Sequence, residues 1–240
     1  MKVIILAAGR GRRLPKKISK IPKSLLQINN KSLIERQIDI FKSYNINQIA
    51  IVTGFKRHLF KKFKLHEFYN KKWNTTNMVY SLSKAKRWLL NDECIVTYGD
   101  IIFEKKELKK IINSRHKLSI LFDKNWKKLW KKRFNNPLTD AETFDFSKKK
   151  YLKEIGKKTD DYSKIKGQFM GILKFKPIAW KKFDLVNKRY FKKNKKVYTT
   201  DILNSMVKNE NFKIKVLEYK NKWSEIDNKK DIDITNKLFK

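Results

Sequence analysis

The sequence has almost no cysteine: Cys94 is the only one among 240 residues, which excludes an internal disulfide. A lone thiol followed by Ile95 and Val96 is typical of a buried strand in a cytoplasmic protein. No apolar run approaches the roughly 18 residues that a membrane span needs. The first apolar run is also too short for a signal peptide and ends in Gly-Arg. We therefore expect a cytoplasmic protein without a membrane span.

Acidic residues are scarce as well, and 60 lysines and arginines against 23 acids give a formal charge of +37. Such a balance first suggests a nucleic-acid partner. The lysines, however, are spread from Lys16 to Lys240 instead of forming one arm, and abundant Lys, Asn and Ile are typical of AT-rich coding. We favour a solvated basic surface, which would also attract an anionic triphosphate. A basic nucleic-acid-binding protein is kept as the remote alternative, and no nucleic-acid partner is expected.

Glycine is scarce too, yet two of the seven glycines, Gly9 and Gly11, lie in one loop. The loop follows a short apolar run, Val3 to Leu6, which predicts a strand buried on both faces. Glycine lets the main chain approach a ligand closely, and such a loop can turn N–H groups toward phosphate oxygens. Four cations bracket this loop: Arg10, Arg12, Arg13 and Lys23.

Two common phosphate loops are excluded by the letters. A P-loop needs Gly-Lys followed by Ser or Thr, and that sequence does not occur. The dinucleotide fingerprint G-x-G-x-x-G fails because its third glycine would fall at Leu14. The loop is therefore a phosphate-binding candidate of a different kind.

Strands and helices alternate along most of the chain, which is typical of a parallel α/β sheet. Ser32 and Glu35 have the spacing of a capping box and predict a helix to about residue 43. Further helices are predicted over about 59–64, 76–90, 104–113, 199–208 and 229–239, with one that starts at Pro177 and covers only the first half of 182–196. Further strands are predicted over 48–53, 65–69, 93–98, 117–123, 142–146, 151–156, 167–175 and 212–219.

The predicted fold is α/β, a Rossmann-like three-layer α/β/α sandwich with a mainly parallel central sheet in a single domain of residues 1–240. Residues 124–166 break the alternation with aromatic and acidic residues, and predict an inserted lid with a small β excursion on the acceptor side. Trp126 and Trp130 lie four residues apart. That spacing fits one helical face of a small core, which we favour, or contacts to a ligand.

Two aspartates, Asp100 and Asp227, follow strand-like segments far apart in the sequence. Ligands of parallel sheets bind at the carboxyl ends of the strands, and Mg²⁺ takes one or two carboxylates plus phosphate oxygens. The alternative for Asp100 is a loop cap. With Lys23 and the loop arginines to stabilise charge, this set favours in-line attack by an acceptor phosphate on the α-phosphate of a nucleoside triphosphate.

The opening of the chain resembles that of the nucleotidyltransferase superfamily, L-A-A-G-x-G-x-R-L followed by P-K-x-L. This chain reads Leu6-Ala7-Ala8-Gly9-Arg10-Gly11-Arg12-Arg13-Leu14, and then Pro22-Lys23-Ser24-Leu25. Nearly the whole chain resembles the branch of phosphocholine and aminoethylphosphonate cytidylyltransferases. The residues that carry this likeness are 77–82, 99–100, 125–126 through 140–142, 167–171 and 223–227.

The resemblance implies a Mg²⁺-dependent enzyme that transfers CMP from CTP to a small phosphorylated or phosphonate acceptor and releases pyrophosphate. It implies Asp100 and Asp227 as the metal ligands and, with Lys23 and Arg13, as the catalytic residues. The implied nucleotide-binding residues are Leu6, Ala7, Ala8, Gly9, Arg10, Gly11, Arg12, Arg13, Lys23, Asn77, Ser81 and Gly99. Thr76 or Asn77 alternatively serves only to cap a helix.

The runner-up is a sugar-1-phosphate nucleotidyltransferase. Members of that group typically carry a glycine-containing segment where this chain has residues 77–82, and this difference favours CTP.

Acceptor contacts are expected from a third group of residues. Acids would offset an ammonium group, and an indole would face it by cation–π contact. The candidates are Asp123, Trp126, Asp140, Glu142, Gln168 and Trp223. The short cationic stretch of residues 15–21 favours an acceptor more anionic than phosphocholine, such as a phosphorylated amino acid or a carboxylate-bearing phosphonate. The identity of the acceptor and the formation of a homodimer are left open.

Overall fold

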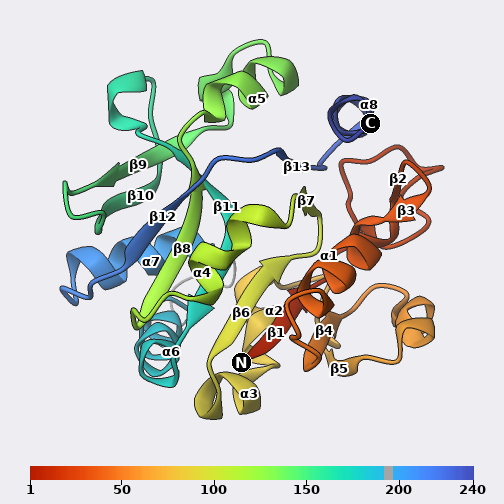
Figure 1. Cartoon of the computed structure of the whole chain (residues 1–240), viewed down its shortest axis with the longest axis horizontal. Coiled ribbons are helices and arrows are strands. Elements are labelled where there is room, and N and C mark those ends of the chain that lie inside the picture. Colours follow the sequence, from red (N-terminus) through yellow and green to blue (C-terminus); the bar gives the residue numbers. More distant parts are fainter. Residues whose placement is uncertain (192–196) are drawn as a thin grey trace. The chain divides into compact units, whose positions relative to one another are not determined.

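The computed structural model describes residues 1–191 and 197–240 of the chain. The chain divides into two compact units, each coloured by sequence in Figure 1. Unit 1 comprises residues 1–105 and 221–240, and unit 2 comprises residues 106–220. The two units are described in turn.

Unit 1 contains a parallel sheet with the strand order β6-β1-β4-β5. Its strands are β1 (Lys2–Leu6), β2 (Gln27–Ile28), β3 (Lys31–Ser32), β4 (Ile49–Thr53), β5 (His66–Tyr69), β6 (Cys94–Tyr98), β7 (Ile101–Phe103) and β13 (Trp223–Glu225). Its helices are α1 (Leu33–Lys42), α2 (Met78–Ser83), α3 (Lys86–Asn91) and α8 (Lys229–Leu238), with 3₁₀ turns η1 (Lys23–Leu25) and η2 (Arg57–Phe63).

The central strands of unit 1 are apolar because both faces of this sheet are covered. Strand β4 is buried along its whole length, and Val3, Ile4 and Ile5 of β1 are fully buried. The capping box predicted for α1 is confirmed: the Ser32 hydroxyl accepts from the backbone N–H of Glu35, and the Glu35 carboxylate accepts from the N–H of Ser32. The helix begins one residue after its cap, as the spacing predicts.

The single helix predicted over 76–90 is wrong. The chain forms two short helices, α2 and α3, separated at Lys84 and Ala85. Asn77 stands at the N-cap position of α2, but its side chain makes no capping hydrogen bond, and the Thr76 hydroxyl donates to the carbonyl of Lys72 instead. The expected cap is therefore wrong as well. The apolar pattern continued across the break, so it could not reveal where the helix ends.

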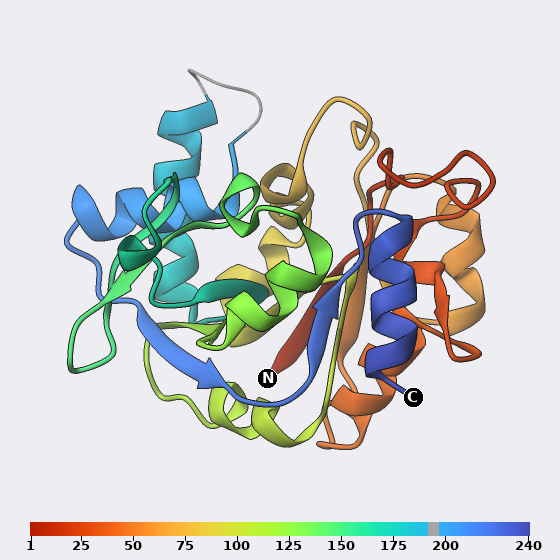
Figure 2. The ribbon, with the colours of Figure 1, turned by 90° about the horizontal axis from the view of Figure 1, so that it is seen from above.

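The C-terminal helix α8 belongs to unit 1 and lies beside the β2–β3 hairpin (Figures 1 and 2). Ile28 of the hairpin and Ile226 before α8 share an apolar cluster with Leu14. Ile232 of the helix and Phe239, which follows it, pack against this cluster. Ile226 follows β13, which pairs antiparallel with β7. This packing returns the last residues of the chain to the strands of the N-terminal half.

Three of the strands in unit 2 are neighbours in one sheet, in the order β12-β8-β11. Strand β12 is parallel and β11 antiparallel to β8. The strands of unit 2 are β8 (Leu118–Asp123), β9 (Glu142–Phe146), β10 (Leu152–Lys158), β11 (Gln168–Phe175) and β12 (Lys215–Tyr219). Its helices are α4 (Lys109–Ile112), α5 (Trp126–Arg133), α6 (Pro177–Phe191) and α7 (Thr199–Lys208), with 3₁₀ turns η3 (Lys106–Leu108), η4 (Pro137–Thr139) and η5 (Tyr162–Lys164).

The α/β class and the mainly parallel sheet are confirmed, and the small β excursion is present as the antiparallel β9–β10 hairpin. Helix α6 continues to Phe191, beyond the first half of 182–196 to which the prediction limited it, and residues 192–196 lie outside the described residues. The single-domain assignment and the lid role of 124–166 stay predictions.

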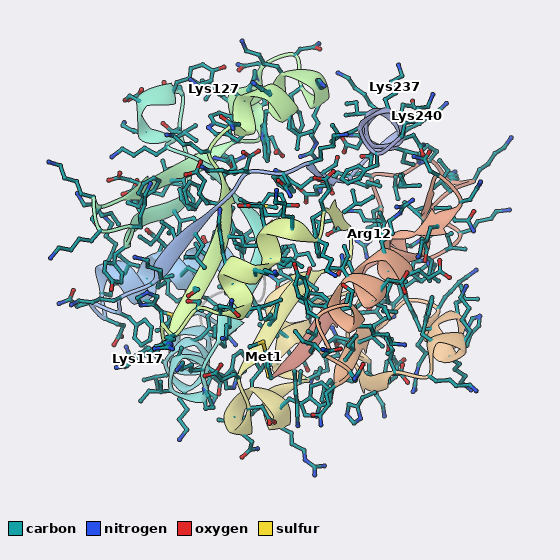
Figure 3. All side chains as sticks on the ribbon, viewed as in Figure 1. Met1, Arg12, Lys117, Lys127, Lys237 and Lys240 are labelled. Atoms are coloured by element: carbon teal, nitrogen blue, oxygen red, sulfur yellow. The ribbon has the colours of Figure 1, made fainter. Side chains whose placement is uncertain are left out.

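Lysine side chains point outward from elements of both units (Figure 3). The 12 largest fully buried side chains among the described residues are mostly aromatic and include Trp126, Trp180 and Phe41. In the described part of the chain, no helix combines the length and apolar character needed to cross a bilayer.

We expect the Cys94 thiol to be inert in the folded protein. The side chain is buried in β6, and burial, reinforced by the nearby Asp92 carboxylate, raises the pKa of the thiol to about 12. Because the thiolate is the reacting species, a disulfide reagent at pH 8 should label Cys94 only after unfolding in guanidinium. Rapid labelling of the folded protein at pH 8 would contradict this placement.

Candidate active site

The glycine loop leaves β1 at the carboxyl edge of the parallel sheet in unit 1. β1 and β6 run side by side and end together, with Leu6 opposite Tyr98. The N–H of Gly99 donates to the carbonyl of Leu6 at 2.9 Å, so Gly99 and Asp100 start where the loop starts. The parallel register therefore brings two segments that are about 90 residues apart in the sequence to one edge of the sheet.

Gly11 allows the loop to turn back onto Lys23. Its φ of +76° lies in the left-handed region, which residues with a side chain rarely adopt. A Cβ at this position would also lie 2.9 Å from Leu14 Cδ1 and 3.1 Å from Lys23 Cγ. The glycine thus satisfies both the backbone conformation and the close approach of the lysine.

Lys23 forms the centre of the site. Its ammonium nitrogen lies 2.8 Å from Asp100 Oδ2 and 2.6 Å from Asp227 Oδ1, and only 13% of the side chain is exposed. Burial by itself lowers the pKa of this lysine, but the surrounding carboxylates outweigh it and raise the pKa above its ordinary value. Lys23 is therefore a fixed positive charge between two carboxylates.

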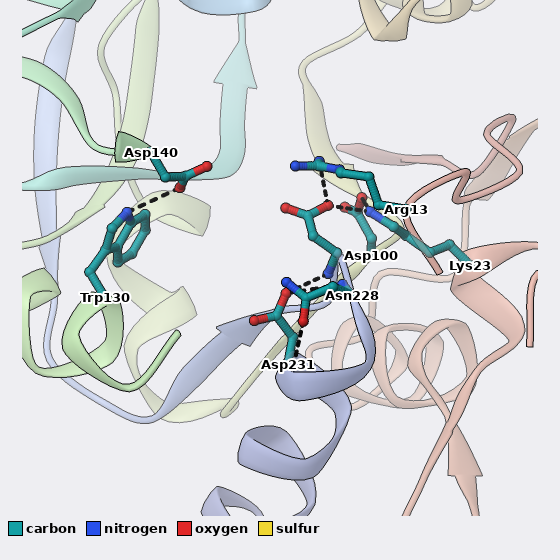
Figure 4. Close-up of polar contacts among 8 residues, drawn as sticks. Arg13, Lys23, Asp100, Trp130, Asp140, Asn228 and Asp231 are labelled. Carbon is teal, nitrogen blue, oxygen red and sulfur yellow. Dashed lines mark hydrogen bonds and ion pairs between the residues drawn. The ribbon is translucent and has the colours of Figure 1, made fainter. Parts of the chain in front are cut away.

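Arg13 supplies a second cation to the same cluster (Figure 4). Its guanidinium nitrogen lies 2.7 Å from Asp227 Oδ1, although two thirds of the arginine side chain is exposed. Glu225 adds a third carboxylate: one oxygen each from Asp100, Glu225 and Asp227 lie within 4.8 Å of one another. We call Asp100, Glu225 and Asp227 the carboxylate cluster.

Asp227 reaches the cluster because two local structures hold its backbone. The N–H of Ile226 donates to the carbonyl of Asp100 at 3.0 Å, which extends the β7–β13 pairing to the two aspartates. The buried carboxylate of Asp231 accepts from the N–H of Asp227 at 2.8 Å and from that of Asn228 at 3.2 Å. Asp231 is also the partner of Asn228 in the capping box of α8, as Figure 4 shows.

A cavity of about 180 Å³ opens beside Lys23. It is lined mainly by residues of the glycine loop and of the segments that carry the two aspartates. The lining residues are Leu6, Ala7, Gly9, Gly11, Arg12, Arg13, Lys23, Ser24, Gly99, Asp100 and Asp227. The cavity therefore joins backbone N–H groups and cations, which suit a polyphosphate, with carboxylates, which suit a metal ion bound to it.

Comparisons with known proteins identify the family of the chain. Residues 3–124 match the family model for MobA-like NTP transferase domains. The chain is 35% identical to the CTP:phosphoglutamine cytidylyltransferase of Campylobacter jejuni, over 98% of both chains. It is 40% identical to the choline-phosphate cytidylyltransferase of Streptococcus pneumoniae, over 40% of this chain and 43% of the other.

The chain belongs to the MobA-like NTP transferase family. It is a nucleotidyltransferase of the cytidylyltransferase type, as its likeness over nearly the full length shows. Solved structures agree on the fold: the CTP:phosphocholine cytidylyltransferase of Streptococcus pneumoniae superposes with a TM-score of 0.76 at 23% identity, over 100% of this chain and 99% of the other. A glucose-1-phosphate thymidylyltransferase of Bacillus anthracis gives 0.78 at 19%, over 99% and 94%.

Most of the nucleotide-binding residues predicted for the cytidylyltransferase line the cavity, and four do not. Ala8 is buried next to the loop, and Arg10 lies over the Phe55 ring at 5.4 Å. Ser81 is buried and accepts a hydrogen bond of 2.9 Å from the amide of Asn70. Asn77 stands at the start of α2. Their contacts to a nucleotide stay predictions.

Asn70 organises the segment that precedes α2, a role that the sequence analysis does not predict. It is fully buried, and its amide nitrogen also donates to the Thr76 hydroxyl at 3.1 Å. The segment before α2 is also joined to the glycine loop, since Arg12 donates to the carbonyl of Asn74 at 3.0 Å. Asparagine is common in turns of every kind, so its type alone could not have marked it.

Five of the predicted acceptor-binding residues lie in unit 2, and four of them come together. Gln168 is opposite Asp123 in the β8–β11 register, and its amide donates to the carbonyl of Glu142 at 2.6 Å. Burial raises the pKa of the Glu142 carboxyl. Asp140 accepts from the indole N–H of Trp130 at 3.1 Å, a contact drawn in Figure 4.

Both remaining indoles are buried. Trp126 on α5 is 1% exposed and contacts Trp130 edge-on, as expected for a small core. Trp223 belongs to unit 1, where it pairs with Phe103 between β13 and β7 and is 4% exposed. Their contact with an acceptor stays a prediction.

We expect Gly99→Ala to destabilise the fold and disturb Asp100. A Cβ at Gly99 would lie 2.7 Å from the carbonyl oxygen of Leu6, a backbone atom that cannot move without shifting β1. The strain should cost about 1–3 kcal/mol and lower the melting temperature by several degrees. The matched control is Gly9→Ala, because no atom lies within 4 Å of its added Cβ. Equal melting temperatures for the two variants would contradict this reading of the Gly99 contact.

Proposed function

We propose that this cytidylyltransferase transfers CMP from CTP to the phosphate of a phosphorylated amino acid or amide, with phosphoglutamine as the first candidate, and releases pyrophosphate. The observation that carries the proposal is the Lys23 ammonium, which lies between Asp100 and Asp227 beside the glycine loop. The likeness to a CTP:phosphoglutamine cytidylyltransferase over nearly the whole chain supports the choice of acceptor.

The triphosphate would bind in the cavity beside Lys23. Lys23 and Arg13 are cations within reach of it, and the loop backbone supplies N–H groups. Ser24 also lines the cavity, and its buried hydroxyl has no hydrogen-bond partner among the described residues. An unpaired buried hydroxyl costs about 1–3 kcal/mol, so a phosphate oxygen that accepts from it would relieve this cost.

The carboxylate cluster has the donor set that a divalent cation needs. Three carboxylate oxygens within 4.8 Å of one another suit Mg²⁺, which prefers oxygen ligands and binds through a few carboxylates plus phosphate oxygens. The ion would be held by Asp100 and Asp227, as the sequence predicts, and also by Glu225, which the sequence does not predict. When bound, Mg²⁺ would neutralise the charge that develops on the α-phosphate and on the leaving pyrophosphate.

We infer that Lys23 and Arg13 neutralise the cluster until substrates arrive. Each cation is within 2.8 Å of a carboxylate oxygen that a metal would use. Phosphate oxygens compete for the same two side chains, and a metal ion competes for the same carboxylates. When the metal–nucleotide pair binds, the cations would therefore pair with phosphate oxygens and the carboxylates with the metal ion, so that no charge is left unpaired.

The residues of the site position the reaction and stabilise its charge. An oxygen of the acceptor phosphate attacks the α-phosphorus in line, and the bond from the α-phosphorus to the pyrophosphate oxygen breaks. Lys23 and Arg13 stabilise the negative charge that passes to the pyrophosphate. Among the described residues that line the cavity, none is histidine or cysteine, and the acceptor phosphate is itself the nucleophile.

Two groups of charges support an acceptor with an amino-acid part. Residues 15–21 follow the glycine loop and carry exposed Lys16, Lys17 and Lys20, which favour an extra negative charge such as a carboxylate. The acids predicted to offset an ammonium, Asp123, Asp140 and Glu142, belong to unit 2, and their contact with the acceptor stays a prediction. A phosphorylated amino acid carries both charges, whereas phosphocholine carries only the cationic one besides its phosphate.

The proposal predicts pyrophosphate release with CTP, Mg²⁺ and phosphoglutamine. The assay should compare four nucleoside triphosphates and a panel of phosphoglutamine, phosphoserine, phosphocholine, aminoethylphosphonate and hexose 1-phosphates. We expect Asp100→Asn and Asp227→Asn to lower kcat on the order of 10²–10³-fold, because each removes charge stabilisation at the reacting centre. Asp39→Asn is the matched control, since the ion pair that Asp39 forms among the described residues is with the exposed Lys31.

Turnover with a different triphosphate and a hexose 1-phosphate would identify the enzyme as a sugar-1-phosphate nucleotidyltransferase instead. Turnover with CTP and phosphocholine alone would retain the reaction and refute the amino-acid acceptor.

A further inference from the structure

A polar side chain interrupts the apolar face of α1. Leu33, Ile34, Ile38 and Phe41 form that face, and Gln37 lies among them with 1% of its surface exposed. A buried amide must find hydrogen-bond partners or lose free energy. Its partners therefore indicate why a glutamine occupies this position.

Both partners of Gln37 belong to the segment that carries Asp100. The amide nitrogen donates to the carbonyl of Tyr98 at 2.9 Å and to that of Ile101 at 2.8 Å. These two carbonyls bracket Gly99 and Asp100. One side chain on α1 thus ties down the residue before and the residue after the Gly99–Asp100 pair.

The carbonyl of Ile101 takes no part in the hydrogen bonds between β7 and β13. In antiparallel pairs, hydrogen-bonded residues alternate with non-bonded ones. The ladder bonds run from the N–H of Ile226 to Asp100 and from the N–H of Glu104 to Lys222. Ile101 lies between them opposite Glu225, so its carbonyl is turned away from β13 and toward α1.

The orientation of the amide is fixed by these two carbonyls. Both amide hydrogens of Gln37 are used, while its Oε1 atom is buried without a hydrogen-bond partner among the described residues. The opposite orientation would place that oxygen against two carbonyl oxygens. Gln37 Oε1 therefore stays unpaired among the described residues, while the amide nitrogen keeps both hydrogen bonds to residues 98 and 101.

We propose that Gln37 is a positioning residue that fixes the direction of the Asp100 carboxylate. It holds the Tyr98 and Ile101 carbonyls from the α1 side, while the N–H of Ile226 holds the Asp100 carbonyl from the β13 side. The carbonyls of Tyr98, Asp100 and Ile101 are then each held by a hydrogen bond, which sets the Asp100 carboxylate within reach of Lys23 and of the other two carboxylates of the cluster. The consequence for catalysis rests on the proposed function, whereas the consequence for the backbone does not.

The test compares two variants of Gln37 with a control on the same helix. Gln37→Met keeps the length of the side chain and removes both donors, and Gln37→Glu replaces the donors by acceptors. Ser32→Ala removes the N-cap of α1. It should destabilise the same helix without removing a hydrogen bond to residues 98–101. All four proteins are assayed at a temperature at which circular dichroism shows each to be fully folded.

Hydrogen exchange is the first readout because it requires no activity. We expect peptides that cover residues 99–103 to exchange at least about tenfold faster in both Gln37 variants, and at the wild-type rate in Ser32→Ala. Steady-state kinetics is the second. We expect kcat to fall about tenfold or more and the Mg²⁺ concentration for half-maximal rate to rise, with the KM for the acceptor within about twofold of wild type.

The inference is overturned if the Gln37 variants match Ser32→Ala in both the exchange of residues 99–103 and the dependence of rate on Mg²⁺. Failure of the proposed function has a different signature: no turnover of CTP by the wild-type protein, with the faster exchange in the Gln37 variants still present. The two outcomes are therefore distinguishable in one set of proteins.

Discussion

The double ion pair of Lys23 is the interaction on which the site depends. It joins Asp100 and Asp227, which lie 77 and 204 positions away from Lys23 in the sequence. Three carboxylates this close would repel one another strongly in a partly buried setting, and a buried unpaired charge is costly. Lys23, with Arg13, allows the acids to be gathered before any substrate binds. The fold can therefore build a preorganised anionic cluster inside a strongly basic protein.

The surrounding structure keeps this arrangement rigid from several directions. Gly11 and Gly99 give the backbone the room that the lysine and the first strand require. Asp231 holds the backbone of Asp227 through the capping box of α8, and Gln37 holds the segment of Asp100. The contacts of Asp231 and Gln37 are to main-chain atoms, so the positions of the two aspartates follow from the backbone. Sites supported in this way lose little free energy to reorganisation during the reaction.

The central residues could be predicted from the sequence because each is marked by its position. Lys23 follows the glycine loop, and Asp100 follows a short apolar strand, which places both at the carboxyl edge of a parallel sheet. Asp227 follows a strand-like segment near the end of the chain, and the resemblance to the family assigns it the same role as Asp100. Glu225 was missed because its proximity depends on the antiparallel pairing of β13 with β7, between segments about 120 residues apart. No local pattern reports such a pairing.

Other differences have local causes. Gln37 was detectable in principle, because it is the single polar residue within the apolar stripe of α1, but the stripe alone does not name its partners. The division of the 76–90 segment into α2 and α3 was not, since apolar residues continue on both sides of Lys84. Long-range pairing and helix breaks without proline or glycine are thus the features that sequence patterns described least well here.

The most direct test of the account is Mn²⁺ binding, followed by electron paramagnetic resonance, in the wild-type protein and in Lys23→Met. If Lys23 occupies the carboxylates in the free enzyme, the wild type should bind Mn²⁺ weakly without nucleotide and more tightly with CTP. Lys23→Met should bind Mn²⁺ without nucleotide about tenfold more tightly than the wild type, a difference of about 1.4 kcal/mol. Equal or weaker Mn²⁺ binding by Lys23→Met would contradict the exchange of partners at this site.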